Sequence, residues 1–188
     1  MSTISDISLE PLKEAKFVKT QLMHYTQNGI RKFWEIADVH DSVSILIYHK
    51  HKEVFILVKQ LRPAVYLKND DGFTHELCAG ICDKDISLAE IASEEILEEC
   101  GYEVQAGKLE RITAFYTAVG FAGSNQTLFY TEVDESMKRS EGGGIEHEEI
   151  EVVELTIKEA RAFIFDETKA KTPGVMFAFM WWFERHKV

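Results

Sequence analysis

Gly80 to Tyr102 read GICDKDISLAEIASEEILEECGY, a segment that predicts a helix with four glutamates in its last turns. Ser87 and Glu90 have the spacing of a capping box, in which a hydroxyl and a carboxylate each accept a hydrogen bond from an N–H group at the helix start. Gly101 is typical of the residue that ends a helix, because glycine adopts a left-handed conformation without strain. The helix is therefore predicted to begin and end inside this segment.

The acidic residues of this helix continue its apolar side. At about 100° per residue, Glu95, Glu98 and Glu99 fall within roughly one 100° arc, on the side of Leu88 and Ile91. Carboxylates placed in this way repel each other, and they lose hydration when they are covered. A hard divalent cation, Mg²⁺ or Mn²⁺, prefers oxygen ligands and would stabilise the cluster. A solvated acidic helix in an acidic protein is the alternative interpretation.

The segment resembles the Nudix box, which marks a family of hydrolases. The box places a glycine before a helix that carries Arg-Glu, an apolar residue, any residue and Glu-Glu, and it closes with a glycine and an apolar residue. Two positions depart from it, because Ile86 replaces the first glutamate of the box and Glu94 replaces its arginine. That arginine normally braces the carboxylates, so its loss either tightens metal binding or weakens the site. Seven positions are in register: Gly80, Glu95, Ile96, Glu98, Glu99, Gly101 and Tyr102.

Other segments resemble one branch of that family, the nucleoside diphosphate sugar pyrophosphatases. They are residues 58–66 (VKQLRPAVY), 76–80 (ELCAG) and 142–152 (GGGIEHEEIEV). Residues 25–29, 40–43 and 123–130 are most similar to the UDP-sugar diphosphatases of that branch. The resemblance covers nearly the whole chain. It implies an α/β fold, the Nudix α/β/α sandwich around a mixed sheet, with an N-terminal antiparallel hairpin as an extension.

The activity implied by the resemblance is Mg²⁺-dependent hydrolysis of the pyrophosphate of a nucleoside diphosphate sugar, with Mn²⁺ as a substitute cation. UDP-glucose, cleaved to UMP and glucose 1-phosphate, is the first expected substrate, and ADP-ribose is the second. A catalytically silent nucleotide-sugar sensor is the alternative from another class, because Ile86 and Glu94 depart from the box.

Metal ligands and a general base follow from the same resemblance, position by position. The base is expected at Glu146, with Glu98 as the second candidate, because the family does not use one position uniformly. A mobile glycine run over residues 140–144 could carry the following acidic residues toward the substrate, although a solvated connector is the alternative. The metal ligands are expected at Ala79 (through its carbonyl), Glu95, Glu99 and Glu148.

Four residues are expected to bind the substrate. Trp34 resembles the aromatic residue that stacks on the nucleobase, although tryptophan is as often a core or interface residue. Arg62 could bind a phosphate oxygen, although an arginine at a strand end is as often a surface charge. Ser124 and Gln126 are neutral hydrogen-bonding groups that suit a sugar or a uracil edge.

Length and composition agree with one enzyme domain and an extension. The 188 residues, 45% hydrophobic and 28% charged, suffice to bury a full core without disulfides. We expect residues 1–40 to form an N-terminal extension and hairpin that makes a homodimer, and residues 41–188 to form the Nudix domain.

Composition also argues against several partners. The net charge of −11 argues against nucleic acid, because phosphates are neutralised by excess lysine and arginine. Cys78, Cys82 and Cys100 lack zinc-like spacing, and we expect them to be reduced thiols of a cytoplasmic protein. Residues 1–17 lack the apolar core of a signal peptide. The apolar run over residues 175–183 is far shorter than the about 20 residues that cross a bilayer, so no membrane partner is expected.

Strands and helices are predicted in an order typical of an α/β sandwich. Asn28 and Gly29 are typical of a hairpin turn. Strands are predicted at residues 17–25, 31–36, 42–48, 54–60, 109–115, 126–133 and 151–155. Helices are predicted at residues 87–100, 157–165 and 173–186, with Pro173 in the first turn of the last one.

Overall fold

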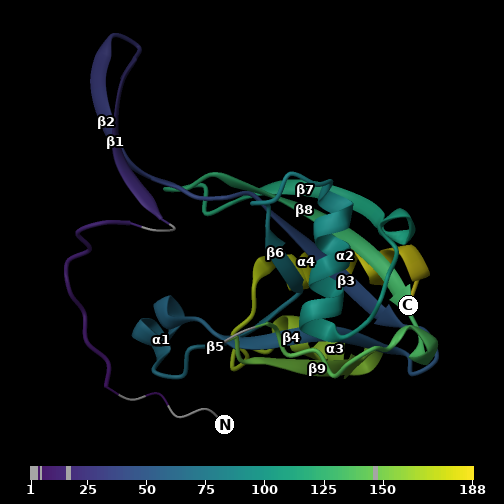
Figure 1. The fold of residues 1–188 in the computed structure, drawn as a ribbon. Helices are drawn as coiled ribbons and strands as arrows, with labels where there is room; N and C mark the ends of the chain where they lie inside the picture. Colours follow the sequence, from purple (N-terminus) through teal and green to yellow (C-terminus); the bar gives the residue numbers. More distant parts are fainter. Residues whose placement is uncertain (1–3, 5, 16–17, 146–147) are drawn as a thin grey trace. The chain divides into compact units, whose positions relative to one another are not determined.

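A computed structural model describes residues 4, 6–15, 18–145 and 148–188, which belong to two compact units (Figure 1). The smaller unit contains Met1–Val39 and Thr117–Ser124. The larger unit contains His40–Tyr116 and Asn125–Val188. The segment at 117–124 thus joins the N-terminal extension, although it lies inside the range expected for the Nudix domain.

The smaller unit is built on the predicted antiparallel hairpin. β1 (Lys19–Gln27) pairs with β2 (Ile30–Asp38) along its whole length. Asn28 and Gly29 connect the strands with φ values of 54° and 77°. Both values lie in the left-handed region, which one common two-residue hairpin turn requires at both of its central residues. Asparagine and glycine adopt this region readily, which is why the pair Asn-Gly predicts a hairpin turn.

The larger unit contains a mixed sheet with seven strands. Its main order is β5, β4, β3, β8 and β7, while β6 also pairs with β3 and β9 with β4. β3 and β8 are parallel, whereas β4 and β6 run antiparallel to β3. The strands are β3 (Ser42–His49), β4 (Val54–Leu61), β5 (Phe73–Glu76), β6 (Cys78–Ile81), β7 (Glu110–Thr117), β8 (Ser124–Val133) and β9 (Ile150–Thr156).

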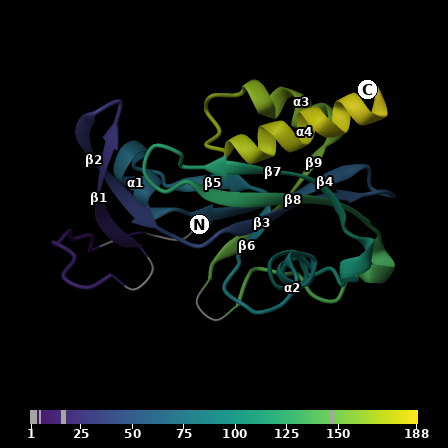
Figure 2. The ribbon, with the colours of Figure 1, turned by 90° about the horizontal axis from the view of Figure 1, so that it is seen from above.

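Helices cover both faces of this sheet (Figure 2). α2 (Leu88–Cys100) lies on one face, and α3 (Ile157–Phe165) and α4 (Pro173–His186) lie on the other. Side chains alternate along β3, so that Ile45 and Ile47 join the core under α2 while Leu46 joins the core under α3 and α4. The predicted α/β/α sandwich around a mixed sheet is confirmed.

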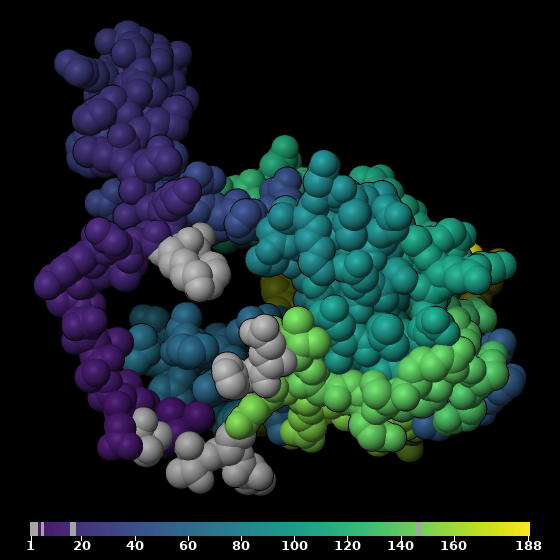
Figure 3. All heavy atoms as spheres, in the orientation of Figure 1, coloured from purple at the N-terminus to yellow at the C-terminus, as the bar shows by residue number. Residues whose placement is uncertain are grey.

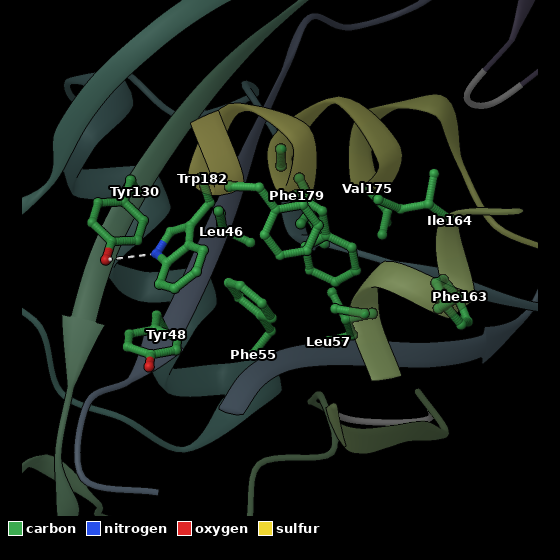
Figure 4. Close-up of a cluster of buried hydrophobic side chains, with 14 of the residues drawn as sticks. Leu46, Tyr48, Phe55, Leu57, Tyr130, Phe163, Ile164, Val175, Phe179 and Trp182 are labelled. Carbon is green, nitrogen blue, oxygen red and sulfur yellow. Dashed lines mark hydrogen bonds between the residues drawn. The ribbon is translucent and has the colours of Figure 1, made fainter. Parts of the chain in front are cut away.

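α4 explains the aromatic run near the C-terminus. Its buried face packs on the sheet, where Phe55 contacts the rings of Phe179 and Trp182 at centroid distances of 4.7 and 4.9 Å (Figure 4). The Trp182 indole N–H donates to the Tyr130 hydroxyl at 3.3 Å. This helix is therefore a core helix, and no helix in the described part of the chain has the length and apolar character needed to cross a membrane.

The other predicted elements are confirmed to within a few residues, and some short ones were missed. α1 (Pro63–Asn69) buries none of its residues and has no side-chain cap, so neither periodicity nor capping marks it. β5 and β6 have four residues each, which is too short for a clear alternation. The 3₁₀ turns Ala106–Lys108 and Glu135–Met137 were also not predicted.

Candidate active site

The predicted cap residues hold α2 at both ends. The Ser87 hydroxyl accepts from the Glu90 N–H at 3.2 Å, and the Glu90 carboxylate accepts from the Ser87 N–H at 2.8 Å. Gly101 has a φ of 76°, and its N–H donates to the Leu97 carbonyl. The helix therefore has a fixed register, and its last two turns carry Glu95 and Glu99.

β6 brings a backbone segment against these two glutamates. It pairs with β3 so that Ala79 lies opposite Ser44. The Ala79 N–H donates to the Glu99 carboxylate at 3.0 Å. A Cβ atom on Gly80 would lie 2.1 Å from a Glu95 carboxylate oxygen, so only glycine leaves room for that side chain. Ala79, Glu95 and Glu99 thus lie side by side, as the resemblance implies.

Burial governs the charge of this pair of carboxylates. Glu99 is only 5% exposed, and burial raises its pKa to about 8, against hydrogen bonds from the Ala79 N–H and the Cys78 thiol that lower it. Burial also raises the pKa of Glu95 to about 7, and the charge of Glu98 adds to this effect. Without a cation, the raised pKa values favour the protonated form of Glu99 at neutral pH, whereas Glu95 titrates close to neutrality. A cation that replaces those protons would relieve the desolvation of the two carboxylates.

The glycine run is hydrogen-bonded to the end of α2, and the mobility expected from the sequence stays a prediction. The Gly143 and Gly144 N–H groups donate to the carbonyls of Glu99 and Glu98 at 2.9 and 3.1 Å. Gly142 has a φ of 71°, and a Cβ atom there would lie 2.2 Å from the Glu99 carbonyl oxygen. Figure 3 shows this green segment running against the teal atoms of α2.

Glu148 follows this anchored run. Its charge raises the pKa of both Glu95 and Glu99, although burial has the larger effect on each of them. Its carboxylate accepts from the Ile145 N–H at 3.1 Å, which holds the side chain in the turn. Glu146, the first candidate for the base, lies outside the described residues.

Arg62 is paired, in contrast to the free surface charge considered as its alternative. Its Nε and Nη2 groups donate to the two carboxylate oxygens of Glu76, both at 2.7 Å. Hydrogen bonding to Glu76 raises the pKa of Arg62, and the charges of Glu99 and Glu148 add to the rise. Arg62 therefore lies near the acidic cluster, which is formed by Glu95, Glu99 and Glu148. The Arg62 side chain is 47% exposed.

Glu76 is not among the site residues predicted from the sequence, although it is the partner of Arg62. The side chains of Thr74 and Glu76 lie on the same side of β5, and the Thr74 hydroxyl donates to the Glu76 carboxylate at 2.5 Å. The sequence signal that could have found this residue is a hydroxyl and a carboxylate two residues apart, shortly before Gly80.

The departure at Glu94 is partly compensated by a lysine. Lys84 Nζ lies 2.5 Å from the Glu94 carboxylate, and both side chains are about half exposed. The Lys84 charge lowers the pKa of Glu95, against the larger effect of burial. A positive charge thus stands near the position of the missing arginine, on the loop before the helix. Ile86, the other departure, is 39% exposed.

The remaining expected substrate residues lie in both units. In the smaller unit, Trp34 is 54% exposed, so it is not a core residue, and its indole N–H donates to the Gly120 carbonyl at 2.8 Å. The Ser124 and Thr117 hydroxyls hydrogen-bond at 2.7 Å. In the larger unit, the Gln126 side-chain amide donates to the Ser42 hydroxyl at 3.0 Å.

The donors at the acidic cluster are carboxylate and carbonyl oxygens, which suit a hard cation. Among the residues that the structure describes, no three acidic, histidine or cysteine side chains lie close enough together to enclose a metal ion. A cation here would therefore need the Ala79 carbonyl or a rotation of the glutamate side chains.

Gly80, the capped helix α2 and Gly101 follow one another in the order of the Nudix box, in a fold with helices on both faces of a mixed sheet. With a relative that is 37% identical over almost its whole length, the chain belongs to the Nudix hydrolase family, among its nucleoside diphosphate sugar pyrophosphatases. No family model matches the chain.

Three similar proteins carry names within this class. The uridine diphosphate glucose pyrophosphatase NUDT14 of Bos taurus is 37% identical over an alignment of 212 positions including gaps, which covers 97% of this chain and 96% of that protein. The protein of the same name from Mus musculus is 34% identical over an alignment of 214 positions including gaps, which covers 98% of this chain and 96% of that protein. The GDP-mannose pyrophosphatase of Pectobacterium atrosepticum is 38% identical over an alignment of 143 positions including gaps, which covers 74% of this chain and 72% of that protein.

Proposed function

We propose that this protein hydrolyses the pyrophosphate of UDP-glucose to UMP and glucose 1-phosphate, with Mg²⁺ as the cation and Mn²⁺ as a substitute. The observation that carries this proposal is the pair of largely buried carboxylates, Glu95 and Glu99, beside Ala79 at the end of a Nudix helix. UDP-glucose is favoured over GDP-mannose because the relatives named for UDP-glucose align with 97% and 98% of the chain, against 74% for the GDP-mannose enzyme.

The proposed cation ligands are the Ala79 carbonyl and the carboxylates of Glu95, Glu99 and Glu148. When bound, the cation neutralises charge that develops on the phosphate oxygens. Burial limits the access of water to Glu99, and the Ala79 N–H fixes one of its oxygens. Glu148 is held in a turn that follows the anchored glycine run.

The attacking water also needs a proton acceptor. We assign this role to Glu146 and keep Glu98 as the second candidate, because both are carboxylates beside the proposed ligands in sequence. Arg62 is the proposed phosphate contact, since its side chain is about half exposed and lies near Glu99 and Glu148.

The base and the sugar need further contacts. Trp34 is the proposed stacking residue, because the hydrogen bond to Gly120 fixes its indole while about half of the residue stays exposed. Ser124 and Gln126 are the proposed polar contacts to uracil or sugar.

We further propose a homodimer formed through the hairpin. Leu22, Met23, Phe33 and Trp34 are each 50% exposed or more in β1 and β2. A two-stranded hairpin is marginally stable unless another surface covers it, and a second copy of the chain would supply that surface. Light scattering coupled to gel filtration should give twice the chain mass of 21.6 kDa, and a single-chain mass would contradict the proposal.

The proposed compartment is the cytoplasm. Cys78, Cys82 and Cys100 are all free thiols, and Cys78 and Cys100 are buried. Reduced thiols are typical of proteins in a reducing compartment. Fluorescence microscopy of the tagged chain in its native cell would test this assignment.

The test of the activity compares UDP-glucose, GDP-mannose and ADP-ribose at equal concentration with Mg²⁺. A phosphomonoesterase is added afterwards, so that phosphate is released only from cleaved pyrophosphates. We expect the highest kcat/KM with UDP-glucose, and activity that is lost with a chelator and restored by Mg²⁺ or Mn²⁺. A preference for another substrate would reassign the specificity. Binding of UDP-glucose without turnover of any of the three would show a nucleotide-sugar sensor instead.

A further inference from the structure

Glu76 is a nearly buried carboxylate that has no role in the reaction proposed above. It ends β5, where it lies opposite Val58 of β4, and its side chain is 11% exposed. A carboxylate in such a position is tolerated only when it is paired and hydrogen-bonded. Glu76 meets this condition, because it accepts hydrogen bonds from Arg62 Nε, Arg62 Nη2 and the Thr74 hydroxyl.

The pairing fixes which edge of the Arg62 guanidinium stays available. Arginine has five N–H donors in one plane. Glu76 takes the Nε–H and one Nη2–H, so the two Nη1–H groups and the second Nη2–H remain. These form the fork that binds two oxygens of a phosphate side by side. The Arg62 side chain is 47% exposed, so part of it is open to a ligand.

The surroundings of Arg62 explain why it needs to be held. Glu99 and Glu148 lie near Arg62, since their carboxylates raise its pKa when they are ionised. An arginine without a partner beside them would turn toward these carboxylates and occupy oxygens that the cation needs. The bidentate pair with Glu76 keeps the guanidinium away from them, while Thr74 fixes the orientation of Glu76.

We propose that Glu76 is a positioning residue, which holds the Nη1–Nη2 edge of Arg62 toward the diphosphate of the substrate. The inference rests on the proposed function of the acidic cluster, and it adds that substrate affinity depends on a carboxylate outside the Nudix box. Glu76 acts only through Arg62, so its effect must disappear when Arg62 is absent.

A double-mutant cycle tests this dependence. Steady-state KM and kcat for UDP-glucose at saturating Mg²⁺ are measured for wild type, Glu76→Gln, Arg62→Met and the double variant. We expect Glu76→Gln to raise KM about tenfold and to change kcat less. We expect the double variant to match Arg62→Met within about twofold.

Glu110→Gln is the matched control. Glu110 accepts two hydrogen bonds from Arg185 Nη1, both at 2.7 Å, so it is another close arginine–carboxylate pair of the larger unit. Its removal should leave KM within about twofold of wild type. Thermal melts followed by circular dichroism establish that each variant is folded. Should Glu76→Gln fail to fold, Glu76→Asp keeps the charge but shortens its reach, and it should also raise KM.

Two results would overturn the inference: an unchanged KM in Glu76→Gln, or an equal effect of Glu76→Gln with and without Arg62. Absence of turnover in wild type would refute the proposed function separately. If wild type shows no turnover, Kd for UDP-glucose is measured for the same four proteins by isothermal titration calorimetry with Mg²⁺ present. Kd should then follow the pattern expected for KM. Absence of binding by wild type would overturn the inference too.

Discussion

Glu99→Gln should make the protein without cation more stable at neutral and alkaline pH, although it removes a proposed ligand. The folded pKa of Glu99 is raised to about 8 from an ordinary 4.5. The folded state therefore binds this proton more tightly than the unfolded state, and the stability present below about pH 4.5 is lost as the pH rises to about 8. At about 1.4 kcal/mol per pKa unit, the loss approaches about 5 kcal/mol once Glu99 is fully ionised. Glutamine keeps the shape and its carbonyl still accepts from the Ala79 N–H, so the variant escapes this loss.

The assay is urea unfolding of wild type and Glu99→Gln in a chelator at several pH values between 5 and 8, followed by circular dichroism. The free energy of unfolding of the variant should exceed that of wild type by several kcal/mol at pH 8, with a much smaller difference at pH 5. Added Mg²⁺ should stabilise wild type far more than the variant. Glu167→Gln, which changes an exposed carboxylate, is the control and should follow wild type. Parallel pH dependences of wild type and Glu99→Gln would refute the assignment of a buried, protonated Glu99.

Four other predictions concern the same site. Gly80→Ala should reduce kcat/KM by about tenfold or more in a folded protein, since its Cβ atom displaces Glu95, and wild-type kinetics would contradict this close packing. Glu94→Arg should lower Mg²⁺ affinity, because it removes a negative charge beside the ligands and leaves Lys84 unpaired, and a clear gain in affinity by calorimetry would favour the sensor. Glu146→Gln should lose the most turnover, with little change in substrate affinity, in a series that also contains Glu148→Gln, Glu149→Gln and Glu98→Gln. A larger loss of turnover in Glu98→Gln would assign the base to α2. Mg²⁺ binding should release protons at pH 7 and tighten as the pH rises to about 8, because the raised pKa values of Glu99 and Glu95 make protons compete with the cation, and calorimetry in buffers of different ionisation enthalpy measures this release.

Much of the fold could be predicted because its main elements carry local signals. Ser87, Glu90 and Gly101 mark the ends of α2, and Asn28-Gly29 marks the hairpin. α1, β5 and β6 carry weaker signals, because α1 buries none of its seven residues and each of the two strands has only four residues. The positions of β5 and β6 depend on their pairing with β4 and β3, which only the assembled sheet defines.

The candidate site could be predicted where its residues share one helix, and less so where it combines distant segments. Glu95, Glu98 and Glu99 follow from helical geometry alone. The pair between Arg62 and Glu76 depends on the register of β4 against β5, which a sequence does not give. The pairing of Lys84 with Glu94 depends on a loop conformation, and the attachment of the glycine run depends on φ values that glycine permits but does not dictate.

³¹P NMR of UDP-glucose incubated with the protein and Mg²⁺ tests the central claim most directly. The two pyrophosphate resonances should disappear together and be replaced by equal amounts of UMP and glucose 1-phosphate, while Glu99→Gln should leave the substrate intact over the same time. Formation of UDP and glucose, or an unchanged spectrum with wild type, would contradict pyrophosphate hydrolysis at this site.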